Sequence, residues 1–162
     1  MIYTNRYNSP LGEIIMESNG DALTALAFKG QKHFKIKENT QEKTLPIFQK
    51  VTQWLDKYFS GENPEINFKL AQNGTNFQMT VWEILKSIPY GKTTTYGDIS
   101  NLIATQKGIK KMSAQAVGGA IGKNPIAIII PCHRVLGKNG ELTGYAGGVL
   151  KKQKLLEIEK IL

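Results

Sequence analysis

The stretch SAQAVGGAIGKNPIAIIIPCHRV (residues 113–135) carries the features that decide the fold and the chemistry of this chain. Its first part predicts a short helix over 114–121, because Ser113 can cap the start and Gly122 favours an end there. Alanine and glycine leave almost no side-chain bulk on this helix. Each interior glycine lowers the stability of a helix by about 1 kcal/mol relative to alanine. The pattern therefore indicates that another group must approach the backbone of this helix closely. Tight packing against another helix and a slim helix in a narrow groove of DNA both meet that requirement.

The second part of the stretch places a thiol directly after an apolar run. Residues 126–130 are typical of a buried strand, and Pro131 ends its hydrogen bonding just before Cys132 and His133. Neighbours in a strand point to opposite faces, so these two side chains cooperate only if the chain turns or a water bridges them. If the imidazole accepts the thiol proton, the thiolate becomes a strong nucleophile. The alternative is an inert, buried small side chain.

Two further helices are expected before this stretch. Thr75 and Gln78 form a capping-box pattern, and Thr95 with Asp98 starts the next helix. A Lys-rich loop joins this helix to the one over 114–121, and such a pair in a basic region suggests a helix-turn-helix. The second part of the chain is therefore expected to be mostly helical, with a winged-helix-like helix-turn-helix.

The first third predicts a small antiparallel sheet covered by a helix. Three β-compatible runs are separated by turn signals: 2–8, 12–18 and 22–28. Apolar residues then recur at helical spacing between Pro46 and Gly61. The expected fold class is α+β, with an N-terminal α/β domain over 1–72 and a C-terminal domain over 73–162.

Charge is distributed unevenly along the chain. Residues 1–70 carry nine Lys and Arg against eight Asp and Glu, whereas residues 71–162 carry twelve against five. The excess in the second part favours a polyanionic partner, nucleic acid first, although a Lys-rich solvated surface is the plainer interpretation.

Composition narrows the class of protein. A hydrophobic fraction of 41% over 162 residues is typical of a globular chain. No apolar run reaches the about 18 residues of a membrane span, and the first residues lack a signal-peptide pattern. We therefore expect a cytoplasmic protein with no membrane partner. One cysteine excludes an internal disulfide and is too few for a thiolate zinc site, so we expect no metal. We also expect no cofactor.

The motif Ile130-Pro-Cys-His-Arg-Val135 closely resembles that of the O6-alkylguanine-DNA alkyltransferases, the methylated-DNA:protein-cysteine methyltransferases. The runs at 116–120 and 144–148 extend the similarity, which covers about 77–159. The resemblance implies direct DNA repair. A guanine alkylated at O6, and also a thymine alkylated at O4, is flipped out of the duplex, and Cys132 takes the alkyl group irreversibly. The implied partner is double-stranded DNA, bound by a monomer through the minor groove.

The resemblance also implies the catalytic residues. In the family a His activates the thiol of Cys132 through a water, and a Glu orients that His. These positions are His133 and Glu159 in this sequence. The family's Asn that ties the active-site turn to the recognition helix corresponds to Asn124.

The same resemblance implies the residues that hold the base. Tyr96 corresponds to the Tyr that helps to swing the nucleotide out and donates to the guanine ring. The pocket wall corresponds to Val135, Tyr145 and Ala146. The carbonyl of Val135 would accept from the guanine amino group, and the N–H of Ala146 would face O6.

DNA contacts are expected around the helix pair and one later loop: Thr95, Gln115, Ala116, Gly119, Lys110, Lys111 and Lys138. One position departs from the family. Most relatives have an Arg that fills the gap left by the flipped base, and this chain has Gln115 there. The loop before it also looks longer and carries Lys107 as well as Lys110 and Lys111, and these departures concern base extrusion and not the transfer chemistry.

Two other functions fit parts of the pattern. A non-catalytic lesion sensor of the same fold would lack the nucleophile, and Cys132 argues against it. A Cys-His-Glu thiol hydrolase unrelated to DNA would use the same thiolate on a carbonyl. Turnover separates the hydrolase from an alkyltransferase, because a hydrolase regenerates its thiol and an alkyltransferase does not.

Overall fold

The structure is a computed structural model that describes all residues from Met1 to Leu162. The chain forms two compact units. The N-terminal unit contains residues 1–73 and 125–127, and the C-terminal unit contains 74–124 and 128–162.

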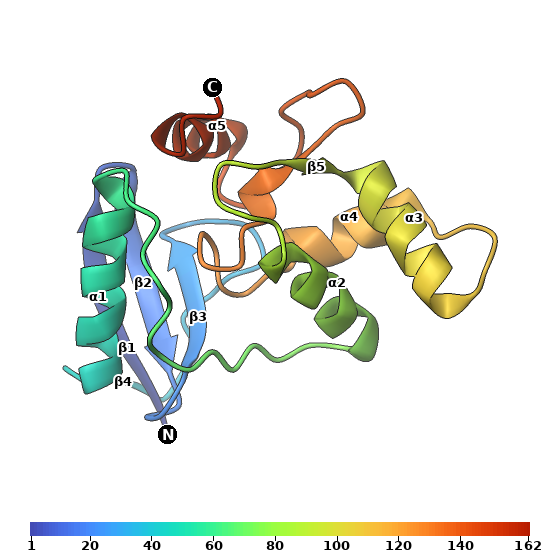
Figure 1. Cartoon of the computed structure of the whole chain (residues 1–162). Coiled ribbons are helices and arrows are strands. Elements are labelled where there is room, and N and C mark those ends of the chain that lie inside the picture. The colour runs from blue at the N-terminus through green and yellow to red at the C-terminus, as the bar shows by residue number, and fades with distance from the viewer. The chain divides into compact units, whose positions relative to one another are not determined.

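The N-terminal unit is built on a four-stranded sheet with the order β3-β2-β1-β4 (Figure 1). Its strands are β1 (Ile2–Ser9), β2 (Gly12–Ser18), β3 (Leu23–Phe28) and β4 (Thr40–Glu42). The first three pair antiparallel, as predicted from their β-compatible composition and the turn signals between them. Strand β4 pairs parallel to the start of β1 and was not predicted, because three mostly polar residues carry no strand pattern.

Helix α1 (Pro46–Phe59) covers one face of this sheet (Figure 1). Proline at its first position has a backbone angle already suited to a helix. The helix buries one apolar stripe: Ile47, Phe48, Val51, Trp54, Leu55 and Tyr58. The segment 125–127 pairs with β3, at the edge of the sheet opposite β4. The Leu26 amide donates to the Pro125 carbonyl (2.9 Å), and the Ala127 amide donates to the Leu26 carbonyl (2.8 Å).

The C-terminal unit is mostly helical. Its elements are α2 (Asn76–Lys86), β5 (Thr94–Thr95), α3 (Tyr96–Lys107), α4 (Ala114–Gly122), a 3₁₀ turn η1 (Cys132–Arg134), β6 (Val135–Leu136) and α5 (Val149–Ile158). All three predicted caps are present. Thr75 and Gln78 form the full capping box, Thr95 accepts from the Asp98 amide and Ser113 from the Ala116 amide. The expected α+β fold class is confirmed.

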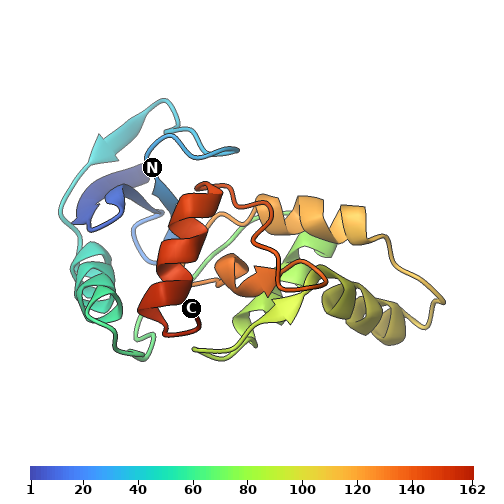
Figure 2. The ribbon, with the colours of Figure 1, turned by 90° about the horizontal axis from the view of Figure 1, so that it is seen from above.

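Helices α3 and α4 lie side by side and are joined by the loop 108–113 (Figure 2). This loop is longer than the three to four residues that are typical of a helix-turn-helix turn. Strands β5 and β6 form a small parallel pair in the same unit, with Thr94 opposite Val135.

The predicted strand over 126–130 is wrong. All five residues are buried, but only Ile126 makes a bridge, with Leu26, and 127–129 form a turn. Ile128 has a φ of 68°, which is rare for a β-branched residue and incompatible with a strand. The extended backbone therefore ends at Ile128, and the run is divided between the two units. Apolar composition alone does not distinguish a buried strand from a buried turn.

Candidate active site

The nucleophile candidate lies in a turn rather than at the exit of a strand. Cys132 opens the 3₁₀ turn η1, which is closed by the Arg134 amide donating to the Pro131 carbonyl (3.0 Å). The turn that Cys132 and His133 need in order to cooperate is therefore present. The side-chain amide of Asn124, just after α4, donates to the Ile130 carbonyl (2.8 Å) and ties that helix to the turn.

The Cys132 thiol is neutral in the resting site. The residue is buried, and burial raises the pKa of the thiol. A hydrogen bond from Asn124 and the charge of Lys152 act in the opposite direction but do not outweigh burial. A protonated thiol is a weak nucleophile, so the site needs a base that takes its proton at the moment of reaction.

His133, Glu159, Arg134 and Gly91 form a buried hydrogen-bonded cluster. The His133 Nε2 lies 2.5 Å from the Glu159 Oε2. The other carboxylate oxygen accepts from the Arg134 Nε (2.8 Å) and from the Gly91 amide (3.1 Å). The structure thus brings His133 and Glu159 together although 26 residues separate them.

The imidazole is set up to act as a base. Burial lowers the pKa of His133, and the Glu159 carboxylate opposes that effect by hydrogen bonding and charge. A neutral imidazole can take a proton, and a carboxylate beside it stabilises the resulting cation. Lys152 and Arg134 add positive charge that lowers the pKa further.

Tyr96, at the start of α3, reaches the segment before α5. Its hydroxyl lies 3.1 Å from the Thr143 carbonyl oxygen and 3.3 Å from that of Gly144. The Lys152 Nζ donates to the same Thr143 carbonyl (2.8 Å) and lies 5.7 Å from the Tyr96 ring centroid. Burial, and then the charge of Cys132, raise the pKa of Tyr96, so its phenol keeps its proton.

The three predicted pocket residues lie on β6 and on a turn before α5. Val135 is buried in β6, and Tyr145 and Ala146 belong to a turn closed by the Gly148 amide donating to the Tyr145 carbonyl (2.9 Å). The Tyr145 hydroxyl is buried and makes no hydrogen bond. Burial raises the pKa of Tyr145 well above its ordinary value, with a further contribution from Cys132. A buried hydroxyl without a partner is costly, which fits a group that a ligand satisfies.

The predicted DNA contacts lie on the surface of the C-terminal unit. Gln115, Ala116, Gly119, Lys110, Lys111 and Lys138 are exposed, and Thr95 is half-buried. The stretch 99–140 contains no Asp or Glu at all. A Cβ added at Gly119 would meet nothing within 4 Å. Packing within the protein therefore does not require glycine at 119.

Three contributors to the site were not predicted. Arg134 belongs to the recognised motif but carried no assigned role, and Gly91 acts through its backbone amide. Lys152 is fully buried, yet in sequence it is one of several lysines near the end of the chain, with nothing to distinguish it. No group of three or more His, Cys, Asp or Glu side chains could hold a metal ion.

Two family models match this chain. The model of the 6-O-methylguanine DNA methyltransferase ribonuclease-like domain matches residues 2–72, and that of the DNA binding domain matches residues 76–161. The chain belongs to the 6-O-methylguanine DNA methyltransferase family. The resemblance found in the sequence is therefore confirmed.

Individual relatives agree with this family over the whole chain. The methylated-DNA–protein-cysteine methyltransferase of Haemophilus influenzae is 40% identical and the match covers 99% of this chain and 87% of that protein. That of Methanosarcina acetivorans is 42% identical over 98% of both. The crystal structure of Mycobacterium tuberculosis OGT in complex with DNA is 41% identical and has a TM-score of 0.85, covering 98% of this chain and 92% of that one.

The expected enzyme class is confirmed as well. The chain is a methylated-DNA–protein-cysteine methyltransferase of the alkyltransferase type of DNA repair, and it binds DNA. The alternative of a thiol hydrolase unrelated to DNA finds no support among these relatives. No helix of the structure is both long and apolar enough to cross a membrane.

Proposed function

We propose that Cys132 removes the alkyl group from O6-alkylguanine, and from O4-alkylthymine, in double-stranded DNA and keeps it. The observation that carries this proposal is the chain's only thiol, buried next to a His133–Glu159 pair with a 2.5 Å contact. The product is a thioether, whose C–S bond neither water nor another thiol breaks, and the chain has no second cysteine to react in its place. Each molecule therefore reacts once.

The transfer is a displacement at the alkyl carbon. The neutral His133 imidazole takes the thiol proton through a bridging water, and the Glu159 carboxylate stabilises the cation that forms. The Cys132 sulfur then attacks the alkyl carbon, and the bond between that carbon and O6 breaks with its electron pair going to the guanine. The guanine takes up one proton, so the products are a thioether and an ordinary guanine.

The base must leave the duplex to reach a buried sulfur, at an unstacking cost of a few kcal/mol. Tyr96 donates to the guanine ring, and the flipped base lies against Val135, Tyr145 and Ala146. Asn124 keeps the turn that carries Cys132 fixed to α4, which supports this arrangement through its bond to Ile130.

Helix α4 lies in the minor groove in this proposal. Its small, exposed residues Ala116 and Gly119 allow a close approach, and Gln115 takes the place left by the flipped base. Lys110, Lys111 and Lys138 neutralise phosphates, with Thr95 contributing its polar side chain at the start of α3. The absence of carboxylates from 99–140 supports this surface over any other in the C-terminal unit. The protein acts as a monomer and, because its thiol must stay reduced, in the cytoplasm.

Intact-mass measurement tests the proposal directly. After mixing with excess duplex DNA that contains O6-methylguanine, we expect the wild type to gain one methyl group, located on Cys132 by peptide mapping. Cys132→Ala should gain none and still bind the DNA. Repeated turnover, or a methyl group on another residue, would contradict the proposal.

A further inference from the structure

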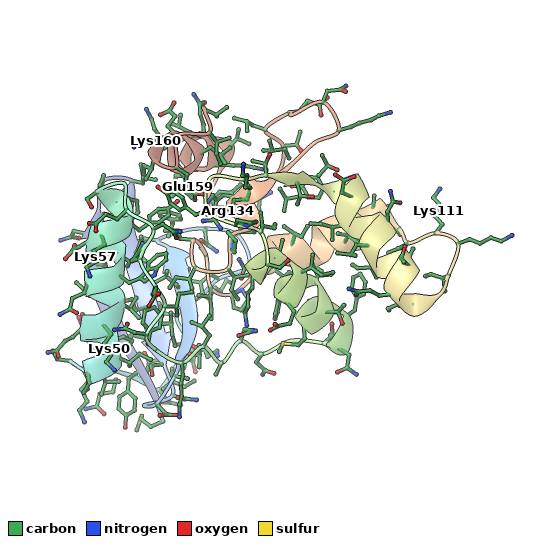
Figure 3. All side chains as sticks on the ribbon, in the orientation of Figure 1. Lys50, Lys57, Lys111, Arg134, Glu159 and Lys160 are labelled. Carbon is green, nitrogen blue, oxygen red and sulfur yellow. The ribbon has the colours of Figure 1, made fainter.

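Arg134 is held on three sides. Its Nε donates to the Glu159 Oε1 (2.8 Å), a terminal guanidinium nitrogen donates to the Ile88 carbonyl (2.7 Å), and its carbon Cζ lies 5.7 Å from the Tyr90 ring centroid. The residue is only 8% exposed, and Figure 3 shows it next to Glu159. Burying a guanidinium is costly unless its charge is paired, and Glu159 supplies the opposite charge here.

The two oxygens of Glu159 have different tasks. One oxygen faces the His133 Nε2, while the other accepts from both Arg134 and the Gly91 amide. Glu159 is the C-cap residue that follows α5, so regular helix hydrogen bonding does not extend beyond it. The donors on the second oxygen therefore set the direction in which the first one points.

We propose that Arg134 is a positioning residue for the alkyl transfer, which holds Glu159 so that one carboxylate oxygen stays directed at His133. The inference rests on the proposed role of the His133–Glu159 pair. Arg134 orients the catalytic pair through its hydrogen bond to Glu159.

The charges around His133 give this role a measurable signature. The charged or titratable groups that face the imidazole are Glu159, Arg134, Lys152 and the neighbouring Cys132. Burial lowers the pKa of His133, Glu159 raises it, and the Arg134 and Lys152 charges lower it. Loss of the Arg134 charge by itself would raise the pKa of His133, whereas loss of the Glu159 charge, or of the contact between Glu159 and His133, would lower it.

The experiment compares wild type, Arg134→Gln, Arg134→Lys and Glu159→Gln in two measurements. The first is the pH dependence of the reaction with free O6-benzylguanine, which needs no DNA. The second is the NMR titration of His133. The chain has only two histidines, and exposed His33 in the N-terminal unit serves as the internal reference.

We expect the two neutral variants to shift in the same direction. Glu159→Gln lowers the acid limb of the rate profile and the His133 titration, and Arg134→Gln lowers both by less, because the released carboxylate no longer stays against the imidazole and Glu159 influences the pKa of His133 more than the Arg134 charge does. An upward shift in Arg134→Gln would mean that Glu159 stays in place without Arg134, and would overturn the proposal. The rate of Arg134→Gln at its plateau falls roughly tenfold to a hundredfold, because the pair is misplaced. Arg134→Lys keeps the charge but cannot reach both Glu159 and Ile88, so its titration stays near wild type while its rate is intermediate.

The experiment distinguishes a wrong assignment of the His133–Glu159 pair from a wrong role for Arg134. If Glu159→Gln changes neither profile, the His133–Glu159 pair itself is misassigned. If Glu159→Gln shifts both profiles while Arg134→Gln loses only stability in urea unfolding, Arg134 is a structural residue and the proposal fails. At the plateau of the rate profile the double variant Arg134→Gln/Glu159→Gln should react no more slowly than Glu159→Gln, since the carboxylate that Arg134 positions is already absent. A further, multiplicative drop in rate would also overturn the proposal.

Discussion

The ammonium of Lys152 donates to the Thr143 carbonyl at 2.8 Å, and it does so from a fully buried position. No carboxylate pairs with this charge. Burial lowers the pKa of Lys152 from 10.5 to about 8, and the charge of Cys132 opposes that effect. A buried lysine without a counter-charge destabilises the folded state. Its presence near the nucleophile therefore indicates a requirement other than stability at this position.

Lys152 should make the stability of the protein depend on alkaline pH. Between about pH 8 and 10.5 the unfolded chain keeps the Lys152 proton that the folded chain has lost. Unfolding then takes up a proton, so raising the pH through this range stabilises the folded state. In a Cys132→Ala background, which removes the thiol titration, the free energy of unfolding should rise with pH relative to the matched Lys152→Met variant. Urea unfolding at intervals between pH 7 and 10.5 measures this difference, and two parallel curves would rule out a lowered pKa at Lys152.

The loop between α3 and α4 should bind DNA phosphates. Lys110 and Lys111 are exposed in a stretch without carboxylates, and Figure 3 shows Lys111 on this loop. The double variant Lys110→Ala/Lys111→Ala should bind duplex DNA more weakly, and the slope of log affinity against log salt should fall by about one for each phosphate that is no longer neutralised. Its reaction with free O6-benzylguanine should be unchanged.

A matched variant controls for net charge alone. Lys50→Ala/Lys57→Ala removes two exposed lysines from α1 in the N-terminal unit, and both are labelled in Figure 3. We expect this control to keep nearly the full salt slope. An equal decrease of the salt slope in both double variants would mean that DNA binding depends on the total charge of the protein and not on this loop.

Local signals in the sequence were sufficient for most of the fold. Thr75, Thr95 and Ser113 each cap the helix predicted for them, because a cap depends on residues only three positions apart. Strand β4 and the turn at 127–129 could not be predicted in this way. The first depends on β1, almost 40 residues away, and the second on a division of the apolar run between two units.

Local sequence signals were also insufficient for part of the active site. Cys132 and His133 are neighbours in sequence, so their cooperation could be considered from the motif alone. Glu159 could be assigned only from the resemblance to a family. Arg134 and Lys152 gain their meaning from burial and from partners elsewhere in the chain, and a lysine in a Lys-rich segment gives no sign that it is buried.

Gln115 should be a weaker substitute for arginine in holding the extruded base. It is exposed in the first turn of α4, and its neutral amide can pair with a base edge but lacks the planar cation of arginine. Gln115→Ala should slow repair of duplex DNA modestly, by roughly fivefold for the removal of one hydrogen bond. Gln115→Arg should preserve or improve it. Neither change should affect reaction with a free base, and an equal slowing of both reactions in Gln115→Ala would place Gln115 in the pocket or the fold.

Gly119 offers the sharpest test of the surface that meets DNA. A Cβ added there would meet nothing within 4 Å, and Gly119 lies inside α4, where glycine is less favourable than alanine. Gly119→Ala should therefore raise the free energy of unfolding by about 1 kcal/mol, measured by urea unfolding. Gly119→Leu should also fold and should react normally with free O6-benzylguanine, since its Cβ meets no atom within 4 Å. On duplex DNA the leucine would hold the backbone of α4 away from the groove, so binding and repair should fall sharply, with the alanine variant between leucine and wild type. If Gly119→Leu repairs duplex DNA as fast as the wild type does, the glycines of α4 have no part in the DNA contact, and another surface of the C-terminal unit must approach the groove.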